Sequence, residues 1–220
     1  MAAPQSTIDQ LAALPIPPGA LLIDGARVEG QGGRSDVLSP IDERVLTTLA
    51  VASAADVDRA VASARAAFDD GRWSRMLPAG RKAVLHRLAD LIDRHALDLA
   101  VLGVRDNGTE IGMALKAEPG SAAATFRYYA EAIDKVYGQI APTADNILAL
   151  IHREPVGVVG AIVPWNFPLM IGAWKIAPAL AAGNSVILKP AEQSPFSALR
   201  LAELALEAGI PEGVFNVLPG

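Results

Sequence analysis

The alternation of apolar strand-like and helix-like segments after Pro155 most constrains how this chain can fold. The pattern predicts a strand over 156–163, a helix over 169–182, a strand over 185–188, a helix over 197–208 and a strand over 214–218. Continuous apolar strands that alternate with such helices predict a parallel sheet joined by right-handed crossovers and covered by helices on both faces. The chain is therefore expected to be an α/β protein.

One part of this region resembles a membrane span, because residues 155–174 carry no charge. Pro164 and Pro168 lie within the run, on either side of the polar Asn166, and proline breaks helices. We therefore expect a buried strand, a turn and a buried helix, and no membrane association. Residues 1–9 lack the basic and apolar parts of a secretory signal, which favours a soluble, cytoplasmic protein.

The residues before Pro155 predict strands, then three helices, then a hairpin. Residues 21–28 hold two short strand pieces around an Asp-Gly turn, and 45–51 is a further β-rich piece. The helices are expected after a capping box at Ser53 to Asp56, from Pro78 to about Val104, and over 121–137. A turn cluster within 140–153 predicts the hairpin.

Composition excludes several kinds of chemistry. The 220 residues include no cysteine, so the chain holds no disulfide, no thiolate metal site and no thiol nucleophile. Its 19 basic and 24 acidic side chains give a net charge of −5, which argues against a nucleic-acid partner. The three histidines lie far from the strand ends, and we expect no metal site.

Parallel sheets bind ligands beyond the carboxyl ends of their strands, here at residues 164–168, 189–195 and the turn that begins at Pro219. None of these strands is followed by the glycine-rich dinucleotide fingerprint. In the first loop, two prolines would hold the Asn166 amide rigidly enough to stabilise an oxyanion. The alternative is that Asn166 caps the next helix.

The second loop places Lys189 and Glu192 where the ribose of a dinucleotide would lie in such a sheet. A carboxylate there accepts hydrogen bonds from ribose hydroxyls and repels a 2′-phosphate. The alternative is a solvated pair on an exposed loop.

Three segments together resemble the NAD(P)-dependent aldehyde dehydrogenase superfamily. They are VGVVGAIVPWNFP at 156–168, APALAAGNSVILKPAEQSP at 177–195 and GIPEGVFNVLPG at 209–220. The resemblance covers nearly the whole chain and is weakest before Leu21. Segments 81–85, 128–138 and 153–157 look most like the enzymes that oxidise γ-glutamylaminobutyraldehyde and related aminoaldehydes.

The resemblance implies the N-terminal portion of such an enzyme, with a Rossmann-like sheet. The expected divisions are a flexible segment at 1–20, the first part of the cofactor-binding domain at 21–138, a hairpin arm at 139–154 and the first βαβαβ unit of the NAD-binding domain at 155–220. The hairpin matches the arm through which family members form homo-oligomers.

The resemblance also implies residue roles. Asn166 matches the side-chain donor of the oxyanion hole, and Glu192 favours NAD over NADP. The residues that match cofactor contacts are Ile162, Val163, Pro164, Trp165, Lys189, Ala191, Glu192 and Gly220. The residues that match the aldehyde tunnel are Phe167, Met170, Ile171 and Trp174, whose helical spacing also suits plain core packing. Glu118 falls where aminoaldehyde-oxidising relatives carry a carboxylate for a distal amino group; the alternative is an exposed glutamate at a helix start.

In this family a cysteine thiolate attacks the aldehyde, hydride passes to the nicotinamide, and a glutamate activates water. Both the cysteine and the glutamate lie downstream of the position that matches Gly220. We therefore expect no aldehyde oxidation by the 220-residue chain alone. The alternative is a non-catalytic module that binds a nucleotide or dimerises.

Overall fold

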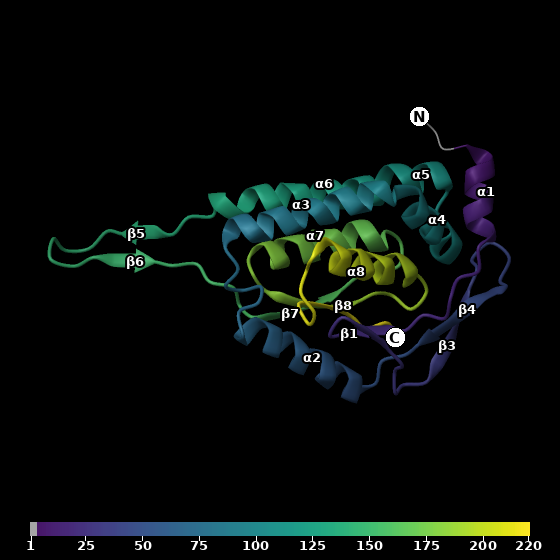
Figure 1. The fold of residues 1–220 in the computed structure, drawn as a ribbon, viewed down its shortest axis with the longest axis horizontal. Coiled ribbons are helices and arrows are strands. Elements are labelled where there is room, and N and C mark those ends of the chain that lie inside the picture. Colours follow the sequence, from purple (N-terminus) through teal and green to yellow (C-terminus); the bar gives the residue numbers. More distant parts are fainter. Residues whose placement is uncertain (1–3) are drawn as a thin grey trace.

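The computed structural model describes residues 4–220, which are built around a five-stranded mixed sheet (Figure 1). The strands lie in the order β2-β1-β9-β8-β7. Their bounds are Ala26–Val28, Leu21–Ile23, Phe215–Val217, Ser185–Lys189 and Val158–Ile162. Strands β7, β8 and β9 pair in parallel, as predicted, and the α/β class is confirmed. The two short strands predicted within residues 21–28 form as β1 and β2, but their antiparallel addition to this sheet was not predicted.

Helices cover both faces of this sheet (Figure 1). The crossover helices α7 (Pro168–Ala181) and α8 (Phe196–Ala208) lie on one face, because both right-handed crossovers step in the same direction across the sheet. Helix α2 (Ala54–Asp69) covers the other face. Its buried Ala60 and Ala64 belong to one hydrophobic cluster with Ile187 of β8, so small side chains let the helix approach the sheet closely.

The predicted capping box begins α2. Ser53 Oγ accepts from the Asp56 backbone N–H at 3.2 Å, and the Ser53 N–H donates to Asp56 Oδ2 at 2.8 Å. The Gln31 backbone N–H and the Arg59 guanidinium also donate to this carboxylate. Burial alone would raise the pKa of the Asp56 carboxyl, but these hydrogen bonds hold the pKa well below its usual range.

A second helical layer packs on α7 and α8. It contains α3 (Pro78–Arg94), α4 (Ala96–Asn107), α5 (Ile111–Ala117) and α6 (Pro119–Ala132), followed by a 3₁₀ turn at Ile133–Lys135. The single helix expected from Pro78 to Val104 is wrong, because the chain leaves helical geometry at His95 (φ −100°, ψ 17°). The change of direction lets α3 pack along α6 while α4 turns toward α5. Helix α5 was not predicted, and α6 ends before the expected Tyr137.

The main core lies between these two helical layers and the sheet. Its largest fully buried side chain is that of Trp73. Trp73 Nε1–H donates to the Leu180 carbonyl of α7 at 2.9 Å, so the polar atom of this indole is satisfied inside the core.

The region before α2 differs most from expectation. Helix α1 (Gln5–Ala13) lies within the segment 1–20 for which no regular structure was predicted; residues 1–3 of that segment lie outside the described part. The predicted Asp24-Gly25 turn joins β1 to β2, with positive φ at both residues (54° and 75°). The Asp24 N–H donates to Asn216 Oδ1 at 2.9 Å, which ties the turn to β9. Strands β3 (Arg34–Leu38) and β4 (Val45–Ala50) form a separate antiparallel pair.

The predicted hairpin forms, from β5 (Gln139–Ala141) and β6 (Ala149–Ile151), and projects away from the body of the molecule (Figure 1). Ile140 and Leu150, which are register partners, are both exposed. No helix within residues 4–220 has the length and apolar character needed to cross a membrane.

Candidate functional site

The carboxyl ends of the three parallel strands bring the predicted loops together. Ile162 at the end of β7 is the register partner of Lys189 at the end of β8. Leu188 is in turn the register partner of Val217 in β9. Residues 163–168, 189–195 and 218–220 therefore leave the sheet at one edge, as expected for parallel strands.

Hydrogen bonds fix these loops to one another. The Val163 N–H donates to the Lys189 carbonyl at 3.1 Å, and the fully buried Ser194 Oγ donates to the Trp165 carbonyl at 3.0 Å. The Pro219 carbonyl accepts from the Ala52 N–H at 3.0 Å. Ser194 was not among the residues predicted to have a role. The signal that could have found it is its position between Pro190 and Pro195, shortly after the predicted strand 185–188.

The residues at the end of β7 that were predicted to contact the cofactor are mostly exposed. The side chains of Ile162 and Trp165 are 74% and 57% exposed, and Pro164 is also exposed. Val163 differs, because its side chain is buried in the main core. The Val163 side chain is therefore not available to a ligand at this edge.

Lys189 and Glu192 form an ion pair beside these residues. Lys189 Nζ lies 3.1 Å from Glu192 Oε2, and both side chains are partly exposed. A backbone hydrogen bond within Glu192 and the Lys189 ammonium lower the pKa of the Glu192 carboxyl. Ala191 is half-buried in the same loop. Gly220 adopts φ 124° against Val51 and Ala52, where a Cβ atom would come within 2.9 Å of the Ala52 nitrogen.

The exposed Asn166 lies at the turn before α7, and the alternative that it caps this helix is wrong. The Met170 N–H in the first turn of α7 donates instead to Glu118 Oε2 at 2.8 Å. The alternative of an exposed Glu118 is also wrong, because Glu118 is only 4% exposed. Burial raises the pKa of the Glu118 carboxyl to about 7, against the lowering effect of the Met170 and Leu169 backbone groups.

Most of the residues predicted to line an aldehyde tunnel lie outside the buried face of α7, although Ile171 packs against the main core. That buried face consists mainly of Leu169, Ala173, Ile176 and Leu180. By contrast, Phe167, Met170 and Ile171 are half-buried, and Trp174 is 52% exposed. Trp174 borders an open cavity of about 310 Å³, lined also by Ser121, Ala124, Thr125, Tyr128 and Tyr129. Plain core packing therefore does not account for Trp174.

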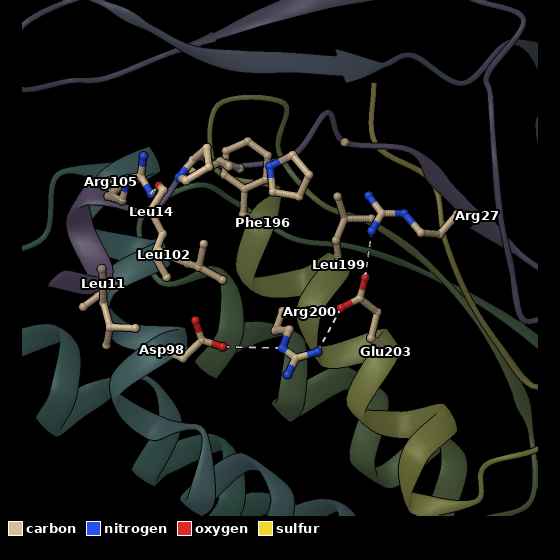
Figure 2. A pocket seen from close by; sticks show the side chains of 15 residues that line it. Leu11, Leu14, Arg27, Asp98, Leu102, Arg105, Phe196, Leu199, Arg200 and Glu203 are labelled. Atoms are coloured by element: carbon tan, nitrogen blue, oxygen red, sulfur yellow. Dashed lines mark hydrogen bonds and ion pairs between the residues drawn. The ribbon is translucent and has the colours of Figure 1, made fainter. Parts of the chain in front are cut away.

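Another cavity, of about 250 Å³, lies between α1, α4 and α8, and no residue of the loops 163–168 or 189–195 lines it. Figure 2 shows Arg200 at its rim, between Asp98 and Glu203. Arg27 pairs with the same Glu203 at 3.3 Å. The basic groups Arg27 and Arg200 are thus already matched by acidic ones.

Among residues 4–220, no group of three or more histidine, aspartate and glutamate side chains is placed to hold a metal ion.

The three loops lie at the edge where parallel α/β sheets bind ligands, and comparison with known proteins defines the class. The sequence profile of the aldehyde dehydrogenase family matches residues 28–220. The chain belongs to the aldehyde dehydrogenase family.

Within this family, the chain is similar to several individual enzymes. The chain is 54% identical over 185 residues to the NADP/NAD-dependent aldehyde dehydrogenase PuuC of Escherichia coli, a match that covers 84% of this chain and 37% of that protein. The crystal structure of γ-glutamyl-γ-aminobutyraldehyde dehydrogenase from Burkholderia cenocepacia superimposes with a TM-score of 0.94 at 50% identity, covering 98% of this chain and 44% of that one. An indole-3-acetaldehyde dehydrogenase in complex with NAD⁺ gives a TM-score of 0.96 at 48% identity, covering 100% and 44%. The chain thus spans less than half the length of these relatives.

Proposed function

We propose that this chain forms the cofactor-binding part of an NAD-dependent aldehyde dehydrogenase, which oxidises an aldehyde to a carboxylate. The observation that carries the proposal is the shared edge at which Ile162, Lys189 and the following loops leave the parallel sheet. The likeness to the NAD⁺ complex of indole-3-acetaldehyde dehydrogenase supports it.

The donor set at this edge suits a dinucleotide. The Glu192 carboxylate would accept hydrogen bonds from the adenosine ribose hydroxyls, and the Lys189 ammonium would donate to the same sugar. The exposed Ile162, Pro164 and Trp165 supply an apolar wall, completed by the Val163 backbone. Ala191 and Gly220 would leave room for the nucleotide beside this wall. A carboxylate at Glu192 would repel the 2′-phosphate of NADP, which favours NAD.

NAD, when bound, supplies the hydride acceptor. The part of this chain in the chemistry is to place the Asn166 amide, whose N–H would donate to the oxyanion that develops on the aldehyde oxygen. The thiolate nucleophile of the family has no counterpart here, because the 220 residues contain no cysteine. The chain by itself is therefore proposed not to oxidise aldehydes.

The proposed substrate class is an aminoaldehyde such as γ-glutamylaminobutyraldehyde, supported by the 50% identity to the Burkholderia enzyme of that name. Phe167, Met170, Ile171 and Trp174 would form one wall of the aldehyde tunnel. Their half-buried and exposed positions on α7 leave apolar surface available for this contact. We assign a different role to Glu118 below.

We further propose that the hairpin of residues 139–154 joins copies of the chain into a homo-oligomer in a soluble, cytoplasmic enzyme. The apolar exposed side chains of Ile140, Leu148 and Leu150 support this role. They would also suit the second candidate function, a dimerisation or nucleotide-binding module without catalysis.

Titration calorimetry of the 220-residue chain with NAD tests the cofactor site. We expect Glu192→Ala to weaken NAD binding about tenfold, because one or two hydrogen bonds to a charged group are lost. Glu203→Ala is the matched control, since Arg200 and Glu203 form the same kind of i,i+3 pair on α8.

Unchanged NAD affinity in Glu192→Ala would remove Glu192 from the site. Equal affinity of the unaltered chain for NADP and NAD would refute the cofactor preference. NADH formation from an aldehyde by the 220-residue chain, with its mass verified, would refute the proposal that the chain alone does not oxidise aldehydes. It would also exclude the non-catalytic alternative.

A further inference from the structure

Both crossover helices begin with residues that cannot cap them. Helix α7 starts after Phe167 with Pro168, and α8 starts at Phe196 after Pro195. Neither the Phe167 nor the Pro195 side chain has an oxygen that could accept from the first backbone N–H groups. The Phe196 N–H is buried and the Met170 N–H is partly buried, and an unpaired donor in such a place is costly.

Two carboxyl groups from the second helical layer meet this need. Glu118, between α5 and α6, accepts from the Met170 N–H of α7 at 2.8 Å. Asp106, near the end of α4, accepts from the Phe196 N–H of α8 at 3.0 Å. The two acidic residues flank one short segment that contains α5, and each reaches a different crossover helix.

Both carboxyl groups are held where bulk water does not reach. Asp106 is 3% exposed and Glu118 is 4% exposed. Burial raises the pKa of both carboxyl groups, and the Glu118 carboxyl raises the pKa of Asp106 further. Within the described residues, Asp106 Oδ1 and Glu118 Oε1 have no hydrogen-bond partner. A buried acid with an unsatisfied oxygen is expensive, so its retention calls for a specific role.

We propose that Glu118 and Asp106 are positioning residues that cap α7 and α8 from outside these helices and thereby fix the two strand-end loops. Each cap lies at the junction of a loop with its helix: residues 163–168 lead into α7, and residues 189–195 lead into α8. Because Ser194 joins the two loops through the Trp165 carbonyl, each loop depends partly on both caps.

This inference deepens the proposed function, since the same loops carry Asn166, Lys189 and Glu192. It replaces a direct contact of Glu118 with the substrate by an indirect effect. The Glu118 oxygen that has a partner is already engaged by the backbone of α7.

Variants of matched shape test the proposal. Glu118→Gln and Asp106→Asn keep an oxygen acceptor, whereas Glu118→Met and Asp106→Leu have similar size and suit a buried site but accept no hydrogen bond. The readout is the exchange rate of individual backbone amide protons, measured by NMR on the 220-residue chain. It requires neither nucleotide nor activity.

We expect Glu118→Met to speed exchange at Met170 and through residues 165–169 by about tenfold or more, with a smaller effect at Phe196. Asp106→Leu should speed exchange at Phe196 and in residues 191–194 by a similar factor. Glu118→Gln and Asp106→Asn should retain the protection of the unaltered chain, which a merely charge-dependent effect would not allow.

Glu110→Met is the matched control. The exposed Glu110 caps α5 through the Gly112 and Met113 N–H groups, at 2.8 Å and 2.9 Å, within the same segment. It should loosen α5 without changing exchange in either loop. Equal acceleration of the loops by Glu110→Met, or uniform acceleration of all core amides by Glu118→Met and Asp106→Leu, would overturn the positioning role.

The affinity for NAD separates this inference from the proposed function. If loop protection and NAD affinity both fall in Glu118→Met and Asp106→Leu, the positioning role and the proposed cofactor site both stand. If loop protection falls but the unaltered chain binds no NAD, the positioning role stands and the proposed cofactor site fails. If loop protection is unchanged in both variants, the positioning role fails, whatever their affinity for NAD.

Discussion

The buried Glu118 carboxyl should make the stability of this protein depend on pH in an unusual direction. Its pKa rises from an ordinary 4.5 to about 7 in the folded protein. A raised carboxyl pKa means that the folded state binds the proton more tightly than the unfolded state does. The resulting stabilisation is fully present below pH 4.5 and is lost as the pH rises through 7.

The size of the effect follows from the two pKa values, since each pH unit between them is worth 1.36 kcal/mol. The full loss is about 3 kcal/mol, most of it between pH 5 and pH 8. Glu118→Gln keeps the acceptor for the Met170 N–H but cannot ionise. The free energy of unfolding of Glu118→Gln, minus that of the unaltered chain, should therefore increase by about 2.5 kcal/mol between pH 5 and pH 8.

Urea unfolding followed by tryptophan fluorescence, at half-unit steps from pH 4 to pH 8.5, measures this difference. Asp106 lies close enough to respond when the Glu118 charge is removed, so Asp106→Asn and the double variant complete a thermodynamic cycle. A difference between Glu118→Gln and the unaltered chain that stays flat from pH 5 to pH 8 would refute the reasoning. So would a difference that falls as the pH rises.

Three further predictions concern other parts of the molecule. Asp56→Ala should lower the free energy of unfolding by about 3 kcal/mol at pH 7, because a buried acceptor of several donors is removed. Since the Asp56 pKa is lowered in the folded protein, the difference in stability between Asp56→Ala and the unaltered chain should shrink as the pH falls into the acid range. Urea unfolding at pH 7 and in the acid range would measure this change. Trp73→Phe should cost about 2 kcal/mol through loss of the hydrogen bond to Leu180 and of packed volume, measured by thermal unfolding, and a cost near zero would contradict the described packing. Ile140→Lys with Leu150→Lys should leave the melting temperature within about 1 °C, because both side chains are exposed, yet lower the mass measured by light scattering; an unchanged mass, when the unaltered chain is oligomeric, would exclude the hairpin as the interface.

The elements that could be predicted are those whose signal is local. The apolar strands after Pro155, the glycine at 209 and the Ser53–Asp56 box each encode their structure within a few residues, and each was found at its expected place. The gathering of the three loops at one edge followed from the parallel topology alone. The kind of ligand that we propose rests on the resemblance to aldehyde dehydrogenases, because the residue patterns alone leave it open.

The features that escaped prediction depend on residues far apart in the sequence. Nothing near residues 21–28 says that their hairpin pairs with β9, because that choice depends on which sheet edge is free. The break at His95 reflects what α3 and α4 pack against rather than any proline or glycine. Glu118 was predicted as a substrate contact, with an exposed helix start as the alternative. Its burial follows only from the position of α7, whose own first residues cannot cap it.

The pairing of β1 with β9 also means that one edge of β1 can find its partner strand only late in the synthesis of the chain. Asp24 and Asn216, which hold the two strands together, lie 192 residues apart. At ribosomal rates of about 5–20 residues per second, the Asp24 turn emerges roughly 10–40 s before its partner strand exists. During that interval β1 can pair only with β2, and the edge of β1 that later joins β9 stays unpaired.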